Sequence, residues 1–387
     1  MKVKTASSST FQPSPFNFQL NYGTSRKDDL YKGLKVNKGV ADVPTVNPYL
    51  KKRIQRKEYT PAEFVEGILK GNITILSQAV TLVESSKYEH QQVAQEIIEK
   101  CLPHAGKSVR IGITGVPGAG KSTSIDAFGM HLIGQGRKLA VLAIDPSSER
   151  SKGSILGDKT RMEALSREKN AFIRPSPSAG SLGGVARKTR ETIVLCEAAG
   201  FDTVFVETVG VGQSETAVHS MVDFFLLIQL AGTGDELQGI KRGIMEMADG
   251  IIINKADGDN LEKAKLAAAQ FRNALHLFPA PESSWSPKVL TYSGYYNLGI
   301  KEIWDMVGEY MEFTQKNGYF NYKRNEQAKY WMYESINDTL RETFYHNPAV
   351  EKMLNFTEQQ VLNNEISSFV AAKRMMDLFL ENLSAKK

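Results

Sequence analysis

The sequence predicts a doubly wound α/β domain built on a mostly parallel sheet, with helical extensions at its N-terminal and C-terminal sides. Short apolar runs alternate with longer helical segments between residues 109 and 291. Such runs are typical of parallel strands that helices cover on both faces. Before and after this region, apolar residues recur every three or four positions, which is the period of an amphipathic helix.

The composition is that of a globular protein. The chain has 387 residues, of which 41% are hydrophobic and 24% charged, so a fibrous or wholly disordered protein is excluded. The formal net charge is +5, but residues 1–60 alone carry 12 Lys and Arg against four Asp and Glu. We therefore expect a flexible basic leader over 1–59. It lacks a recognition module for nucleic acid and the amphipathic period of a transit peptide, so no nucleic-acid partner is expected.

Two further features predict a cytoplasmic protein that does not enter a membrane. No apolar stretch approaches the ~20 residues that span a bilayer, and no charged start is followed by the apolar stretch of a secretion signal. The two cysteines, Cys101 and Cys196, exclude a disulfide framework and are expected to be packing residues in a reducing compartment.

The first structured region is predicted to be helical. Apolar residues such as Phe64, Ile68 and Leu76 recur at helical spacing, Thr60 is suited to cap the first helix, and Pro61 to occupy its first position. The predicted divisions of the chain are a leader over 1–59, N-terminal helices over 60–107, the α/β domain over 108–312 and a C-terminal helical arm over 313–387.

Six apolar runs in the α/β domain are predicted to be strands. They comprise residues 109–114, 139–145, 203–208, 224–230, 250–254 and 288–291. In the C-terminal arm, residues such as Val350, Leu354 and Met375 form apolar stripes on charged helices. Such stripes must be buried, either on the parent domain or on a second copy, and we favour a homodimer.

One glycine-rich turn carries a phosphate-binding pattern. Residues 115–122 fit G-x-x-x-x-G-K-[ST] and lie between a predicted strand and a predicted helix. The members are Gly115, Val116, Pro117, Gly118, Ala119, Gly120, Lys121 and Ser122. Backbone N–H groups of such a loop surround phosphates, and the helix start adds partial positive charge. We expect Lys121 to reach the β- and γ-phosphates and assist catalysis, Ser122 to ligate Mg²⁺, and Thr123 to contact the α-phosphate. The P-loop leaves kinases, ATPases and GTPases open.

A second motif favours guanine over adenine. Asn254, Lys255 and Asp257 form N-K-x-D at the end of a late predicted strand. An ionised Asp257 can accept hydrogen bonds from the N1–H and 2-amino groups of guanine, whereas adenine offers no such donor pair. Lys255 is expected to lay its aliphatic stem along the base, and Asn254 to tie this loop to the P-loop. We therefore predict binding of GTP and GDP.

Two acidic residues end strands on the side where α/β sheets bind ligands. Asp145 and Glu207 can hold Mg²⁺ directly or through water, and Glu207 is also a predicted catalytic residue. Gly210 is expected to meet the γ-phosphate through its N–H. The next residue is Val211, where some GTPases use a glutamine to orient water, so intrinsic hydrolysis should be slow. Gln213, two residues further on, is the candidate substitute.

Two polar loops are candidate switches. One spans residues 157–161 and the other 232–242. A polar connecting loop without function is the alternative for both. Arg161 and Lys241 are the cations we predict to stabilise charge in the transition state.

Taken together, these motifs closely resemble the MeaB/ArgK-like GTPases, the chaperones of methylmalonyl-CoA mutase. The resemblance rests on G-V-P-G-A-G-K-S-T, D-P-S-S, G-D-K-T-R-M, E-T-V-G-V-G-Q-S-E, G-T-G-D-E-L-Q-G-I-K-R-G-I-M-E-M-A-D and N-K-A-D, and extends from about Thr60 to the C-terminus. It implies a homodimeric G protein, joined through its C-terminal helices, that binds a B12-dependent acyl-CoA mutase. It also implies that GTP gates adenosylcobalamin delivery and serves to protect or reactivate the mutase, which in turn accelerates hydrolysis.

The resemblance also implies roles for individual residues. Ser122, Asp145, Asp158 and Glu207 would surround Mg²⁺, and residues 235–241 would form a third switch that faces the partner. The stretch Ser293, Gly294 and Tyr295 would complete the guanine pocket, although Gly294 and Tyr295 depart from the small and charged residues typical there.

Two rival functions come from other classes. A nickel or zinc delivery GTPase would carry clustered metal ligands, but the six histidines are scattered without ligand spacing. An ATP-dependent kinase that acts on a transport protein would need an adenine site, against which the N-K-x-D motif argues. A structural protein with a relic P-loop is disfavoured because Lys121, Ser122 and Asp257 are intact.

Overall fold

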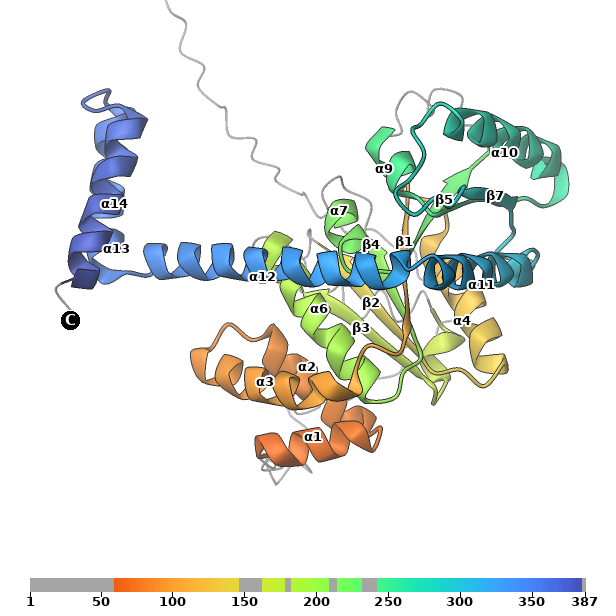
Figure 1. The fold of residues 1–387 in the computed structure, drawn as a ribbon, viewed down its shortest axis with the longest axis horizontal. Coiled ribbons are helices and arrows are strands. Elements are labelled where there is room, and N and C mark those ends of the chain that lie inside the picture. The colour runs from red at the N-terminus through yellow and green to blue at the C-terminus, as the bar shows by residue number, and fades with distance from the viewer. Residues whose placement is uncertain (1–58, 146–161, 178–181, 209–213, 232–241, 385–387) are drawn as a thin grey trace, which may run out of the picture. The chain divides into compact units, whose positions relative to one another are not determined.

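The computed structural model describes residues 59–145, 162–177, 182–208, 214–231 and 242–384 (Figure 1). Within these ranges, seven strands form one sheet in the order β3-β2-β4-β1-β5-β6-β7, and every neighbouring pair is parallel. The strands are β1 (Val109–Gly115), β2 (Leu139–Asp145), β3 (Ala171–Pro177), β4 (Thr203–Thr208), β5 (Phe224–Leu230), β6 (Gly250–Asn254) and β7 (Lys288–Thr291). The predicted doubly wound α/β fold is confirmed.

Strand β3 was not among the predicted strands. Its sequence AFIRPSP contains two prolines and an arginine, which weaken the apolar pattern by which buried strands are recognised. It pairs with β2 along its length, from Leu139 opposite Ala171 to Asp145 opposite Pro177, and it forms one edge of the sheet. Pro175 and Pro177 have no backbone N–H, which is tolerated at an edge.

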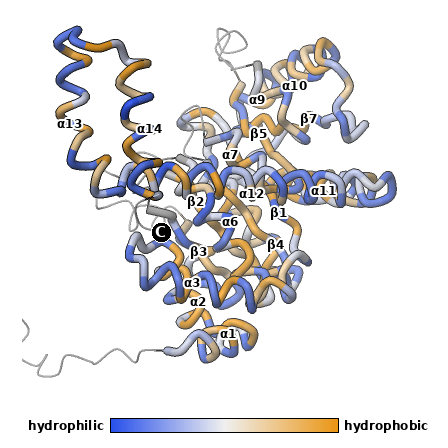
Figure 2. Tube along the Cα trace, turned by 60° about the vertical axis from the view of Figure 1, so that its left-hand side comes forward, coloured by the Kyte–Doolittle hydropathy of each residue, from blue (hydrophilic) through white to orange (hydrophobic). Residues whose placement is uncertain are grey.

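Helices cover both faces of the sheet. They are α1 (Pro61–Leu69), α2 (Ile73–Glu84), α3 (Tyr88–Cys101), α4 (Lys121–Gly134), α6 (Leu182–Ala198), α7 (Ser214–His219), α9 (Arg242–Met247), α10 (Leu261–Leu275) and α11 (Ile300–Lys316). Neighbouring residues of one strand point to opposite faces, so Leu142 joins the core under α6 while Val141 joins the core under α4 and α11. Strand β5, for example, is apolar along most of its length, as Figure 2 shows.

The N-terminal helices extend the core on the α6 face. The Thr60 side chain accepts from the N–H of Glu63 while Glu63 accepts from the N–H of Thr60, and Pro61 occupies the first turn. Helices α2 and α3 pack on α6, and Phe64, Ile68 and their neighbours share one buried cluster with strands β2 and β4. These helices therefore belong to the same compact unit as the sheet.

The chain then continues as three helices, α12 (Tyr319–Tyr345), α13 (Pro348–Leu362) and α14 (Ser368–Ser384). The first turns of α12 carry two ion pairs to residues that precede strands. Arg324 contacts Asp223 through two hydrogen bonds of 2.8 and 2.7 Å, and the ammonium of Lys323 lies 3.5 Å from Asp249. Because these groups are largely buried, they fix the start of α12 at the N-terminal ends of strands β5 and β6.

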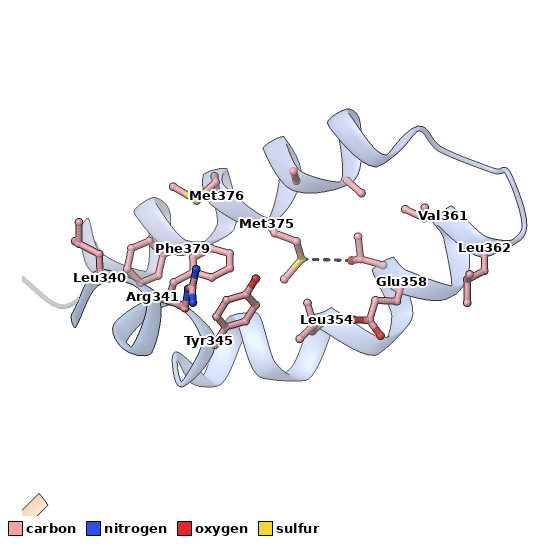
Figure 3. A pocket seen from close by; sticks show the side chains of 14 residues that line it. Leu340, Arg341, Tyr345, Leu354, Glu358, Val361, Leu362, Met375, Met376 and Phe379 are labelled. Atoms are coloured by element: carbon pink, nitrogen blue, oxygen red, sulfur yellow. Dashed lines mark hydrogen bonds between the residues drawn. The ribbon is translucent and has the colours of Figure 1, made fainter. Parts of the chain in front are cut away.

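Beyond α6, helix α12 leads to the hairpin of α13 and α14 (Figure 1). Val350, Met375 and Phe379 form a small buried cluster there, separate from those of the sheet. An apolar groove of about 870 Å³ lies between these helices, lined by residues that include Leu340, Leu354 and Met376 (Figure 3). In the described ranges, no helix combines the length and apolarity that crossing a bilayer requires.

Candidate nucleotide-binding site

The phosphate loop connects β1 to α4, and Val116 to Gly120 form the turn. A Cβ on Gly115 would lie 2.2 Å from the carbonyl oxygen of Ile228, and one on Gly120 would lie 2.6 Å from Asn254 Nδ2. Gly120 also has a φ of 86°, which favours glycine. Both positions therefore require glycine, and the loop is packed tightly against β5 and β6.

Lys121 begins α4 and is half-buried in the loop. Its ammonium donates to the carbonyl oxygen of Gly115 at 2.8 Å. Burial lowers the pKa of Lys121, while the carboxylates of Glu207 and Glu215 oppose that change. The ammonium thus lies in a site where partial desolvation strengthens its attraction for phosphate oxygens.

Ser122 and Glu207 come together at the ends of α4 and β4. The Ser122 hydroxyl donates to Glu207 Oε1 at 3.4 Å, and the Glu207 side chain is buried. Two Mg²⁺ ligands at about 2.1 Å in neighbouring octahedral positions lie roughly 3 Å apart. A hydroxyl and a carboxylate oxygen at this spacing fit a hard divalent cation. Among the described residues, no group of three or more His, Cys, Asp or Glu is arranged to hold a metal.

Asn254 joins the base loop to the phosphate loop. It ends β6, and its Nδ2 donates to the carbonyl oxygen of Ala119 at 2.7 Å. Its Oδ1 accepts from the backbone N–H of Lys255 at 2.7 Å and of Gly294 at 3.2 Å. One buried amide therefore holds three segments together, including a left-handed Lys255 with a φ of 58°.

Asp257 is held by the loop that follows β7. The Ser293 hydroxyl donates to Asp257 Oδ2 at 2.5 Å, and the backbone of Ala256 donates to the carbonyl oxygen of Tyr292 at 2.9 Å. Ser293 and Gly294 are buried, whereas Tyr295 is exposed. The carboxylate that the sequence assigns to guanine is thus oriented by a side chain far away in the sequence.

Of the remaining predicted residues, two lie in the described part of the chain and the others do not. Asp145 ends β2, and its backbone neighbours the end of β4, where Ile144 is opposite Thr208. Asp158, Arg161, Lys241 and the loop 209–213 lie outside the described residues. Thr123 lies in the first turn of α4 and is exposed.

Sequence reasoning assigned no role to two features near the phosphate loop. The Thr208 hydroxyl donates to the Thr114 hydroxyl at 2.9 Å, which joins the ends of β4 and β1 in the buried interior. Glu215, in the first turn of α7, is 3% exposed and acts electrostatically on Lys121. Glu215 is the last residue of the motif E-T-V-G-V-G-Q-S-E, and this position could have indicated a role near the phosphates. The spacing alone did not predict that its side chain is buried.

Comparison with known proteins gives consistent matches over this fold. The family model described as "Methylmalonyl Co-A mutase-associated GTPase MeaB" matches residues 76–349. The chain is 44% identical over 320 residues to "GTPase ArgK" of Escherichia coli, covering 83% of this chain and 97% of that protein. It is 45% identical over 323 residues to "Methylmalonic aciduria type A homolog, mitochondrial" of mouse, covering 81% and 78%.

A solved structure agrees with the sequence matches. The chain is similar to the crystal structure of an "LAO/AO transport system kinase" with a TM-score of 0.66 and 38% identity. The match covers 84% of this chain and 99% of that one. The fold described above therefore occurs in a chain with relatives of two names. The family model and the E. coli relative are named as GTPases, whereas the solved structure is named as a kinase.

Proposed function

This chain belongs to the MeaB family of methylmalonyl Co-A mutase-associated GTPases, and we propose that it uses GTP to control adenosylcobalamin loading into a B12-dependent acyl-CoA mutase. In the same proposal, the chain protects or reactivates that mutase. The chain is a GTPase with a P-loop fold, and guanine nucleotide binding follows from its family. The family name implies association with methylmalonyl-CoA mutase.

The contact network around Asn254 is the observation that best supports the assignment of guanine. This residue connects the phosphate loop to the base loop, so phosphate and base are bound by one rigid unit. Asp257 in that unit is oriented by Ser293 and can accept from both guanine donors. An adenine base would leave this carboxylate without a donor pair, at a cost of about 1–3 kcal/mol or more.

We propose that Ser122 and Glu207 hold Mg²⁺, with Asp145 and Asp158 completing the set. Bound Mg²⁺ would supply positive charge that offsets the charge on the β- and γ-phosphates. Lys121 donates hydrogen bonds to the same phosphates, and the P-loop N–H groups orient them. Arg161 and Lys241 are proposed to add positive charge when the partner is bound, and Val211 leaves intrinsic hydrolysis slow.

We further propose that the chain acts as a homodimer through α12, α13 and α14. Exposed apolar side chains on α12, such as Ile336 and Leu340, continue into the groove of the hairpin. A second copy would remove this surface from water, which is favourable at about 25 cal/mol per Å² of apolar area. We propose no nucleic-acid or membrane partner.

A cytoplasmic location is part of the proposal, although the mouse relative is named as mitochondrial. Cell fractionation with an antibody to the chain, beside cytosolic and organelle markers, tests it. Recovery with an organelle would contradict this part alone and leave the enzymatic part in place.

The decisive experiment measures GTP and ATP turnover with and without a B12-dependent acyl-CoA mutase. We expect slow GTP-specific hydrolysis that rises when mutase is added. Lys121→Ala should abolish it, whereas Lys100→Ala, at an exposed lysine of α3, should not. Equal use of ATP, or no response to any acyl-CoA mutase, would contradict the proposed role. A chelator should suppress turnover, and added Mg²⁺ should restore it.

The name of the solved relative favours one alternative, a kinase that acts on a transport protein. That function needs ATP and a phosphoacceptor, whereas the base loop supports guanine. Transfer of labelled phosphate from ATP to a transport protein, at a rate above that of GTP hydrolysis, would support the alternative.

A further inference from the structure

The loop after β7 is closed by its own backbone. Ser293 and Leu298 exchange two hydrogen bonds of 3.0 Å each, so the residues between them form a tight tip. Asn297 in this tip has a φ of 56°, a left-handed conformation that asparagine tolerates better than most residues. The positions of Tyr295 and Tyr296 are therefore set by a short, constrained turn.

This tip is attached directly to the base-binding carboxylate. The Ser293 hydroxyl that donates to Asp257 also accepts from the backbone N–H of Tyr296 at 3.3 Å. Gly294, which precedes the two tyrosines, donates its N–H to Asn254. The tip and the N-K-x-D loop thus form one hydrogen-bonded unit.

Two aromatic rings project from that unit. Tyr295 is 81% exposed and Tyr296 is 59% exposed. Their ring centroids are 4.9 Å apart and their planes meet at 83°, an edge-to-face arrangement that is favourable for aromatic pairs. Tyr296 therefore restricts the orientation of the Tyr295 ring, while the high exposure of Tyr295 leaves its ring accessible to an incoming aromatic group.

We propose that the ring of Tyr295 stacks on one face of the guanine base, and that Tyr296 is a positioning residue that holds this ring. The inference rests on the proposed guanine site. It adds a contact that does not depend on which base is bound. Asp257 recognises the edge of the base, whereas Tyr295 covers its face and excludes water. Base–aromatic stacking has a substantial effect on affinity because every nucleobase offers a π face.

A protein partner is the other class of occupant that exposed tyrosines could serve. The observations favour guanine because the tip is bonded to Asp257 and Asn254. A surface for a protein partner would not require these bonds to the base loop.

The test measures GDP affinity by calorimetry for the full chain and its variants. Tyr295→Ala should weaken GDP binding roughly 5- to 100-fold. Tyr295→Phe keeps the ring and should stay within about twofold of the unmodified chain. Tyr88→Ala removes a tyrosine of α3 that is 72% exposed, and is the matched control with no expected effect.

Two further measurements separate stacking from a merely structural role. Inosine diphosphate lacks the 2-amino group, yet Tyr295→Ala should weaken its binding by the same factor as that of GDP, since stacking uses the ring face. Tyr296→Ala should raise KM for GTP several-fold while kcat stays unchanged, and Tyr296→Phe should restore KM.

The outcomes distinguish this inference from the proposed function. If the unmodified chain binds no guanine nucleotide, the proposed function fails and this inference fails with it. If it binds GDP and Tyr295→Ala binds within twofold as tightly, only the stacking inference is overturned. Unchanged GDP affinity with reduced stimulation by a mutase would likewise overturn it, in favour of a partner surface.

Discussion

The indole Nε1–H of Trp331 donates a hydrogen bond to the backbone carbonyl of Ser220, with 3.0 Å between the two atoms. Trp331 and Gln327 are the two buried residues of α12, and Gln327 Nε2 donates to the carbonyl of Val222 at 2.8 Å. Both side chains therefore hold the segment that directly follows α7. Since α7 begins directly after residues 209–213, the predicted γ-phosphate loop, α12 is linked to the nucleotide site by a short path.

This link predicts that Trp331 fluorescence depends on the nucleotide. We expect the emission spectrum to differ between GDP and a non-hydrolysable GTP analogue, because movement of α7 changes the polar contact of the indole. The difference should vanish in Trp331→Phe and persist in Trp285→Phe, whose indole instead donates to Asp249. A difference that survives in Trp331→Phe would show that α12 does not follow the nucleotide.

Asp257→Asn should change the preferred base. The amide presents an N–H donor to the 2-position, which suits the carbonyl of xanthine and opposes the amino group of guanine. We expect GTP affinity to fall by about 3 kcal/mol, roughly 100-fold, and XTP to become the better substrate. Competition between the two nucleotides measures this preference, and Asp259→Asn, two positions further on, is the control. Retained preference for GTP would mean that another group recognises the base.

Leu340→Glu should weaken self-association. Leu340 is 60% exposed on α12 and lines the groove of Figure 3, so a charge there would oppose burial against a second copy. Light scattering after size-exclusion chromatography should give a dimer for the unmodified chain and a monomer for the variant at low micromolar concentration.

The matched control for Leu340→Glu is Leu266→Glu on α10. Leu266 is 62% exposed but lies outside the C-terminal helices, so this variant should remain dimeric. A monomeric unmodified chain at these concentrations would contradict the proposed dimer itself.

His219 should make the fold sensitive to mild acid. Burial, with a smaller effect of Lys323, lowers the pKa of His219 to about 3, against a reference of about 6.5. A lowered folded-state pKa gives stability that is present above pH 6.5 and is lost as pH falls towards 3. The loss should be about 1–2 kcal/mol at pH 5. Urea denaturation at pH 7.5 and pH 5 gives the free energy of unfolding at each pH. The decrease between the two pH values should be smaller for His219→Gln than for the unmodified chain. Equal decreases would exclude His219 as the cause of the acid sensitivity.

The sequence allowed much of the fold to be predicted because burial on both faces leaves a strong pattern. Six strands and the P-loop carried such signals, whereas β3 did not, since Pro175 and Pro177 are acceptable only at an edge. The family resemblance implied that Ser293 would complete the guanine pocket, but it did not predict the hydrogen bond from the Ser293 hydroxyl to Asp257, which depends on tertiary packing. The contact of Trp331 with Ser220 joins residues 111 positions apart, and no local rule of spacing predicts it.

The two prolines of β3 also affect whether another polypeptide can add to this edge of the sheet. A free sheet edge is a template on which an extended segment of another polypeptide can add, and such growth leads to insoluble assemblies. At Pro175 and Pro177 the edge offers no amide hydrogen to an incoming strand. The irregularity that hides β3 from pattern recognition thus removes two of the backbone donors that an added strand would need at this edge.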